Sequence, residues 1–110
     1  MSIPTTIDEA IQALTETLSA EDRAAITKMS EDETSDLHHG LGRWIRNNWG
    51  LWQGGPLKDH MQSLGFTHPD DMSGSIIRAF WARMNGLPSK IAEEVEYYKE
   101  FWAKSQAGNQ

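Results

Sequence analysis

The chain has 110 residues, a net charge of −6 and no cysteine. Its length suits a single domain, because two separate cores would each be too small to fold without disulfides or metals. The lack of cysteine excludes disulfides and thiolate zinc sites and favours a reducing compartment, so we expect the cytoplasm. The acidic balance argues against a nucleic-acid partner, and the absence of a long apolar stretch argues against a membrane.

The first two predicted helices are short and have recognisable caps. Thr5 or Thr6 can cap a helix that runs to about Leu18. Its apolar positions recur every three or four residues: Ile7, Ala10, Ile11, Leu14 and Leu18. Ser19 can cap a second helix that ends near Met29.

A third helix is expected to begin at the capping box formed by Ser30 and Glu33. A helical wheel gives this helix one buried face, made of Leu37, Leu41, Trp44, Ile45 and Asn48. Arg46 lies opposite that face on the wheel, and Arg43 and Asn47 lie on its flank. The third helix is therefore predicted to expose its basic residues.

Several glycines lie within or at the ends of the predicted helices in the middle of the chain. Gly40 and Gly42 would each cost about 1 kcal/mol relative to alanine inside a helix, so they indicate close backbone packing or a local distortion. Close packing is the simpler explanation. Gly50 can end the third helix in a left-handed conformation, and a short fourth helix is expected from Pro56 to Gly65.

The fifth helix is expected to begin in the run His68-Pro69-Asp70-Asp71, with one of the aspartates as its cap. Apolar residues cover nearly half of its wheel, which predicts a central position: Met72, Ile76, Ile77, Phe80, Trp81 and Met84. A last helix is expected from Ser89 to about Lys104. Its narrow apolar stripe consists of Ile91, Val95, Tyr98 and Trp102.

These elements predict an all-α fold, a compact bundle of five or six helices with the fifth at its centre. One domain is expected over residues 1–104, followed by a frayed tail at 105–110. Three of the tryptophans, Trp44, Trp81 and Trp102, are assigned to the core.

Few residue patterns point to chemistry. The four histidines, His38, His39, His60 and His68, lack the spacings of zinc sites, and the adjacent pair would point about 100° apart on a helix. Ser73 has no nucleophile elbow around it, and Asp70 with Asp71 suits a helix start better than a catalytic pair. We therefore expect no metal and no cofactor, and a binding protein rather than an enzyme.

Charge is unevenly distributed along the sequence. Residues 1–36 hold nine acidic and two basic side chains, whereas residues 37–58 hold three basic side chains and no acidic one. The middle of the chain is thus a basic, tryptophan-rich island. Pairing of the island with the acidic segment inside the fold is the simpler expectation, and an anionic partner outside the fold is the alternative.

Two runs resemble the signature of a small bacterial family classified only as a domain of unknown function. The first is the glycine-flanked Trp-Ile-Arg-Asn-Asn at 44–48, within residues 37–52, and the second is His-Pro-Asp-Asp-Met-Ser at 68–73. The resemblance covers roughly residues 30–85 and implies a compact α-helical domain of bacterial origin without an established activity.

If the two runs form one unit, side chains from each should meet. Arg43 or Arg46 would then reach the pair of aspartates at 70 and 71, a charge-assisted tie between the third and fifth helices. Asn47 and Asn48 would satisfy buried backbone groups around the loop at 49–52.

The function predicted from these features is a small cytoplasmic protein-interaction or regulatory domain, of which an immunity protein that neutralises a toxin is one form. The expected binding surface lies within residues 43–53 and consists of Arg43, Arg46, Asn47, Trp49 and Trp52. A loop with three glycines can bury one of its two indoles, although both could instead plug the base of the bundle. The alternative function is a small-ligand or anion-binding domain, with catalysis left open, that uses Arg43, Arg46, Asn47 and His39.

Overall fold

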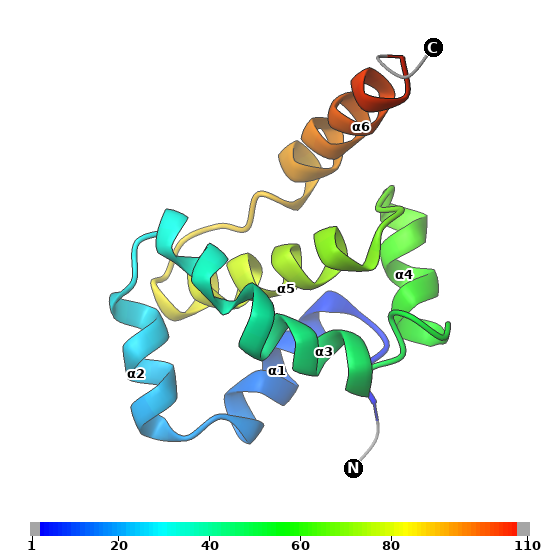
Figure 1. Ribbon diagram of the computed structural model, residues 1–110. Coiled ribbons are helices and arrows are strands. Elements are labelled where there is room, and N and C mark those ends of the chain that lie inside the picture. Colours follow the sequence, from blue (N-terminus) through cyan, green and yellow to red (C-terminus); the bar gives the residue numbers. More distant parts are fainter. Residues whose placement is uncertain (1–2, 108–110) are drawn as a thin grey trace.

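Six α-helices follow one another in residues 3–107, the part of the chain that this computed structural model describes (Figure 1). Two irregular helical segments, a 3₁₀ segment η1 and a π-helical turn η2, lead into the third α-helix. The elements are α1 (Ile7–Thr17), α2 (Ala20–Lys28), η1 (Asp32–Leu37), η2 (His38–Gly42), α3 (Arg43–Asn48), α4 (Pro56–Leu64), α5 (Pro69–Met84) and α6 (Ile91–Ala107). The predicted all-α fold is confirmed.

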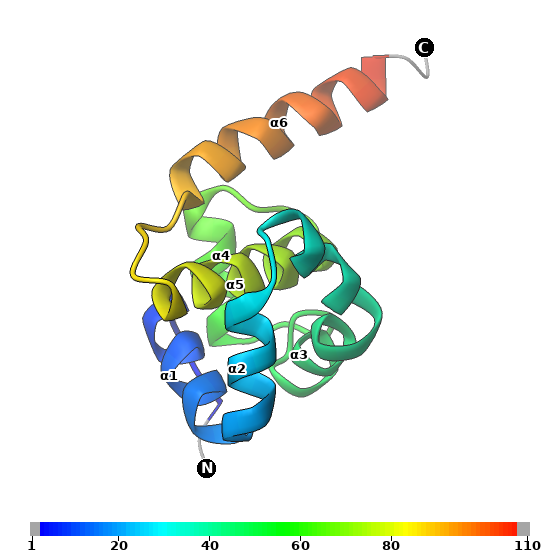
Figure 2. The ribbon, with the colours of Figure 1, turned by 90° about the vertical axis from the view of Figure 1, so that its left-hand side faces the viewer.

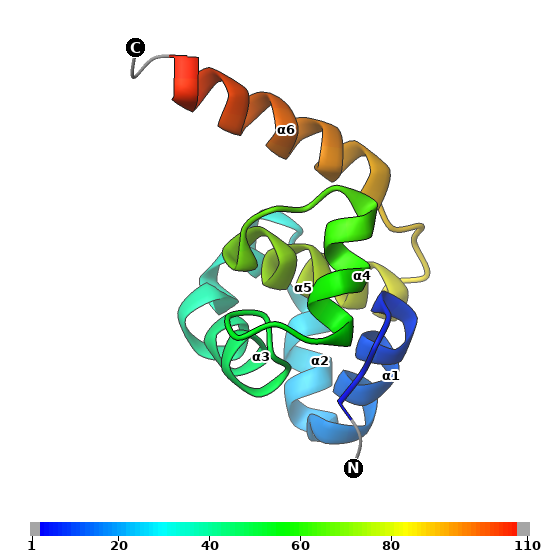
Figure 3. The same ribbon diagram turned by 90° about the vertical axis from the view of Figure 1, so that its right-hand side faces the viewer.

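Helix α5 is the centre of the fold. It contacts each of the other α-helices as well as η1 and η2. Figure 2 and Figure 3 show the other elements arranged around it, with α6 crossing one side of the molecule. Its fully buried residues Met72, Ile76 and Phe80 join a core that also includes Leu14, Ile45, Leu51, Leu57, Met61 and Phe66. The wide apolar arc of this helix therefore predicted its position correctly.

Most helix starts follow the predicted capping. The Thr6 hydroxyl accepts from the Glu9 N–H at 3.1 Å, which selects Thr6 from the two candidates. The Ser19 hydroxyl caps α2 in the same way. The capping box of Ser30 and Glu33 is present, with hydrogen bonds of 2.9 and 3.2 Å.

The start of α5 differs from the prediction. His68, with extended backbone, is the N-cap residue and makes no side-chain capping hydrogen bond. Pro69 opens the helix, since its fixed φ suits the first turn and its missing N–H is not needed there. Asp70 and Asp71 therefore lie inside the first turn, where their charge opposes the positive end of the helix dipole.

The predicted third helix changes its winding along its length. A 3₁₀ segment has fewer residues per turn than an α-helix, and a π-helical turn has more, so a wheel drawn at 3.6 residues per turn loses its phase before α3 begins. The buried side of α3 is formed by Gly42, Ile45, Arg46 and Trp49. Trp44 is 39% exposed and Asn48 is also exposed. The wheel was therefore wrong about Arg46, Trp44 and Asn48.

The tryptophans assigned to the core occupy three different environments. Trp81 packs against the core, and its indole N–H donates to the Met29 carbonyl at 2.8 Å. Trp102 is half-buried at the contact between α6 and the rest of the molecule. Trp44 lies at the surface of α3.

The ends of the described region also differ from the prediction. Helix α6 continues to Ala107, past the boundary expected near Lys104, and residues 108–110 of the predicted tail lie outside the described part of the chain. No helix among the described residues has the length and apolar character needed to cross a bilayer.

Candidate functional site

The five predicted binding residues separate into an exposed and a buried group. Arg43, Asn47 and Trp52 are exposed, and Trp52 has 53% of its surface accessible. Arg46 and Trp49 are buried at 5% and 6% exposure. The loop thus buries one of its two indoles, as expected for a loop of this composition.

Gly50 explains the position of this loop. Its φ of +74° is the left-handed conformation that ends α3, and a Cβ at this position would lie 3.1 Å from the Gly54 carbonyl oxygen. The chain turns sharply here, so that Leu51 enters the core while Trp52 points to solvent.

The exposed face of Trp44 borders two hollows between α1 and the segment formed by η2 and α3. The larger hollow, of about 450 Å³, is lined by Ile3, Pro4, Ala13, Glu16, Thr17, Trp44, Asn48 and Trp49. The smaller, of about 350 Å³, is lined by Leu14, Thr17, Leu18, Gly40, Leu41 and Trp44. Because Thr17 and Trp44 belong to both, we call the two hollows together the Trp44 groove.

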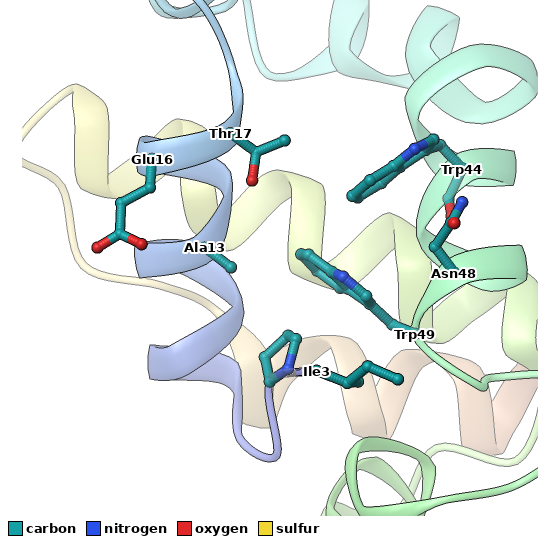
Figure 4. Close-up of a pocket in the computed structure, with 8 residues that line it drawn as sticks. Ile3, Ala13, Glu16, Thr17, Trp44, Asn48 and Trp49 are labelled. Carbon is teal, nitrogen blue, oxygen red and sulfur yellow. The ribbon is translucent and has the colours of Figure 1, made fainter. Parts of the chain in front are cut away.

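The walls of the Trp44 groove are mostly apolar. Figure 4 shows the indoles of Trp44 and Trp49 reaching from α3 toward α1, where Ala13 and Thr17 face them. The two indoles pack edge to face with ring centroids 5.5 Å apart. The Glu16 carboxylate lies on the side of α1 turned away from the indoles (Figure 4) and accepts a hydrogen bond from the Gln12 amide. The larger hollow therefore suits an apolar occupant.

Arg46 is the charged residue that the fold encloses most. Its Nη1 donates to the Ser73 hydroxyl at 2.8 Å, its Nη2 donates to the His38 carbonyl at 3.1 Å, and its Nε lies 3.4 Å from a carboxylate oxygen of Asp70. These partners compensate for the burial of the guanidinium group and join η2 to the start of α5. The predicted tie between the two sequence runs is present, and it joins Arg46 to Asp70.

Two neighbouring predictions about this tie were wrong in detail. Asp71 does not take part, because its carboxylate accepts from the Trp102 indole N–H at 2.8 Å. Asn48 does not hydrogen-bond the backbone of the loop at 49–52 as predicted, because its side-chain amide donates to the Trp44 carbonyl one turn earlier. The basic island also does not pair with the acidic segment as expected, since its ion pair among the described residues is made with Asp70.

A second cleft, lined mainly by polar and charged residue types, lies between η1, η2, α5 and α6. It has a volume of about 330 Å³ and is lined by Thr34, Ser35, His38, His39, Asp70, Asp71, Gly74, Ile77, Arg78 and Tyr98. We call it the histidine cleft. Of the residues assigned to the alternative anion site, His39 lines it, whereas Arg43, Arg46 and Asn47 do not.

Arg78 and its hydrogen-bond partner Tyr98 line one wall of the histidine cleft. Arg78 forms an ion pair with Glu94 at 2.9 Å and donates to the Tyr98 hydroxyl at 2.8 Å. Burial by itself lowers the pKa of the Arg78 guanidinium. The hydrogen bond to Glu94 and the negative charge of that carboxylate act in the opposite direction, and the pKa is raised. Burial also raises the pKa of Tyr98, although the nearby Arg78 opposes this shift. The network holds α6 against α5.

The chemistry of the histidine cleft is limited. Two aspartates face it, and the Arg78 guanidinium is already paired with Glu94, so the cleft does not favour an anion. Within the described residues, no group of three or more His, Asp or Glu side chains is placed to hold a metal ion.

The geometry defines an all-α domain built around α5. The Trp44 groove lies between α1 and the segment of η2 and α3, and the buried Arg46 joins this segment to α5. The model of a domain of unknown function, DUF6794, matches residues 3–84, and the chain belongs to this family. The matched region contains α1 to α5, the Trp44 groove and the Arg46–Asp70 tie, whereas α6 lies outside it. No curated protein and no solved structure matches the chain.

Trp44 is a surface residue that the sequence pattern did not indicate. The signal that could have found it is the pair of glycines at 40 and 42, which marks a departure from regular winding before α3. With the phase reset at Gly42, the buried spacing becomes 42, 45, 46 and 49, and position 44 turns outward.

Proposed function

We propose that this chain is a protein-interaction domain whose Trp44 groove holds an amphipathic helix of another protein. The observation that carries the proposal is the position of Trp44, which is 39% exposed and stands between two hollows. Helices that dock in grooves insert apolar side chains spaced by three, four or seven residues. Two hollows on either side of one indole suit two such side chains.

The acidic residue of α1 at the groove indicates which charge the partner helix should carry on the side facing α1. Among the described residues that line the two hollows, Glu16 of α1 is the one charged residue, and none is basic. A partner helix with Lys or Arg on the side facing α1 would therefore be favoured over one with acidic residues there. The occupant we propose is an amphipathic helix with apolar anchors and a basic flank.

The exposed residues Arg43, Asn47 and Trp52 extend the proposed surface along residues 43–53. Tryptophan and arginine are enriched among residues that dominate binding energy, which supports a contribution from Arg43 and Trp52. Arg46 and Trp49 would act by shaping the surface, because both are buried. We place this interaction in a reducing compartment such as the cytoplasm, which a chain without cysteine favours.

Selection from a displayed library of amphipathic helices tests the proposal without a known partner. We expect the selected peptides to be enriched in large apolar residues at helical spacing and in Lys or Arg on one flank. Replacing the basic flank of a selected peptide by glutamate should weaken its binding.

Two tryptophan variants then locate the contact. Trp44→Ala should weaken binding of a selected peptide by roughly thirtyfold or more, the effect of losing a residue that dominates an interface. Trp52→Ala is the matched comparison, because this indole is exposed but lines neither hollow. Its loss should have a smaller effect, measured by calorimetry. A library that yields no binder, or binders indifferent to Trp44→Ala, would contradict the groove as the binding site.

The anion-binding alternative has less support. Its four residues do not converge on one concave site, since Arg46 is buried with its donors engaged and Arg43 and Asn47 lie away from the histidine cleft. A ligand site requires several polar groups directed at one volume.

A further inference from the structure

Helix α6 has two aromatic faces, and the fold uses one of them. On the face toward the body, Val95 is buried and Tyr98 accepts a hydrogen bond from Arg78. Trp102 stacks on His68 with ring centroids 3.6 Å apart. These contacts explain how α6 is held, but they involve only one side of the helix.

The second face of α6 is a stripe formed by Glu93, Tyr97, Phe101 and Lys104. Spacings of four, four and three residues place them along one side of a helix, and all four side chains are exposed. Tyr97 is 62% exposed and Phe101 is 49% exposed. Their rings stack on each other at 6.4 Å, so the two form a continuous aromatic surface. Two adjacent large aromatic rings in solvent indicate a contact surface rather than scattered exposure.

The order of residues along the stripe is self-complementary. It begins with an acidic residue, continues with two aromatic residues and ends with a basic one, while the exposed Glu100 flanks the stripe beside Phe101. If a second copy of α6 lies antiparallel, Tyr97 faces Phe101 of the second copy, and Glu93 faces Lys104 of the second copy within about one residue of helical rise. A parallel arrangement would instead place like charges together at both ends.

We propose that this stripe is the surface on which two copies of the chain associate, with their α6 helices antiparallel. Such a contact is isologous, because the same patch is used on both copies and the pair closes on itself. All three ribbon views place α6 at the outside of the molecule, with its C-terminal end pointing away from the other helices (Figures 1, 2 and 3).

The size of the stripe sets the strength of the association. One face of a single helix buries much less than the ~1,600 Å² of a standard interface. The dimer is therefore weak and dissociates on dilution. The two aromatic pairs supply most of the buried apolar surface, and the end charges fix the direction of pairing.

Charge reversal at the two ends of the stripe tests the proposal directly. Sedimentation velocity over a range of protein concentrations should show a monomer–dimer equilibrium for the unaltered chain. Glu93→Lys and Lys104→Glu should each weaken dimerisation by roughly tenfold, because two attractive pairs become two repulsive ones. The double variant Glu93→Lys/Lys104→Glu restores both pairs and should dimerise like the unaltered chain. A mixture of the two single variants should form heterodimers, since each then meets its complement.

Controls separate this arrangement from others. Lys99→Glu makes the same charge change on another side of α6 and should leave dimerisation unchanged, and Tyr97→Ala/Phe101→Ala should abolish it. All the substituted residues are exposed, so circular dichroism should report an intact fold. A chain that stays monomeric at high concentration overturns the proposal, as does a double charge variant that fails to recover. Loss of association in Trp44→Ala would also overturn it, because the stripe would then dock in the groove of the next copy.

Discussion

At the residue scale, Arg46 offers the clearest test of what holds the domain together. Its buried guanidinium joins η2 to α5 through Ser73, the His38 carbonyl and Asp70. Arg46→Ala should lower the free energy of unfolding by about 2–3 kcal/mol, because it empties a buried site and removes several hydrogen bonds. Asp70→Ala should cost at most about 1 kcal/mol, because this carboxylate is 55% exposed.

Double-mutant cycles by chemical denaturation would check this assignment. Arg46→Ala and Asp70→Ala should be non-additive by about 0.5 kcal/mol or more, as expected for side chains in contact. Asp71→Ala is the matched control, since this neighbouring aspartate binds Trp102 instead and should add independently to Arg46→Ala. A larger coupling with Asp71 than with Asp70 would contradict the observed pairing.

Local features at the residue scale could be predicted where the cause lies within a few residues. The box of Ser30 and Glu33 and the left-handed Gly50 depend on adjacent backbone groups, so the sequence pattern was sufficient. Asp71 and Trp102 are 31 residues apart in the chain. Nothing in the local sequence of either residue indicates that they meet, because this depends on how α6 lies on α5.

At the scale of elements, Gly40 and Gly42 should respond in opposite ways to substitution. A Cβ on Gly42 would lie 3.0 Å from Nη1 of Arg46 and 3.4 Å from the Leu37 carbonyl oxygen, whereas a Cβ on Gly40 would meet nothing within 4 Å. Arg46 cannot easily move aside, because its hydrogen bonds fix it. Gly42→Ala should therefore destabilise the protein by about 1 kcal/mol, and Gly40→Ala should be neutral or stabilise it by up to about 1 kcal/mol.

Thermal unfolding of both variants would decide between close packing and distortion as the reason for the two glycines. Gly40 also lines the smaller hollow of the Trp44 groove, so a methyl group there should reduce peptide binding without loss of stability. Equal destabilisation by both substitutions would instead mean that the π-helical turn itself requires glycine at each position.

Regular elements were predictable because their periodicity is uniform. Helices α1, α2 and α4 begin close to the residues indicated by their caps or prolines. The segment at 32–48 was not predictable from a wheel, since its winding changes twice before α3. The wrong helical phase also affected the predicted site. Trp44 was assigned to the core and Arg46 to the surface, whereas the structure exposes Trp44 and buries Arg46.

At the scale of the whole molecule, the composition and the apolar arc of α5 were sufficient to predict an all-α domain with this helix at its centre. The Trp44 groove could not be predicted, because it depends on the placement of α1 beside η2 and α3. The aromatic stripe of α6 could not be predicted as exposed either. Tyr97 adjoins Tyr98 and Phe101 adjoins Trp102, so the sequence offers two aromatic faces, and only packing decides which one is buried.

The attachment of α6 to the rest of the molecule should weaken at alkaline pH. Tyr98 accepts from Arg78 at this contact, and burial raises the pKa of its hydroxyl. A group whose pKa is raised in the folded state holds its proton more tightly there than in the detached state. Its contribution to docking is therefore complete below the ordinary tyrosine pKa of about 10, and it is lost as the pH rises through the higher folded value.

Fluorescence of Trp102 in a variant that retains only this tryptophan would follow the docking of α6, while far-ultraviolet circular dichroism follows total helix content. We expect the fluorescence change to precede the loss of helix as pH rises, because α6 is held by one face, whereas the core around α5 is a cluster of apolar side chains that do not titrate. Tyr98→Phe keeps the ring but removes the hydroxyl, so it should shift the detachment of α6 to higher pH. If detachment and unfolding coincide, or if Tyr98→Phe leaves the alkaline midpoint unchanged, Tyr98 does not control the docking of this helix.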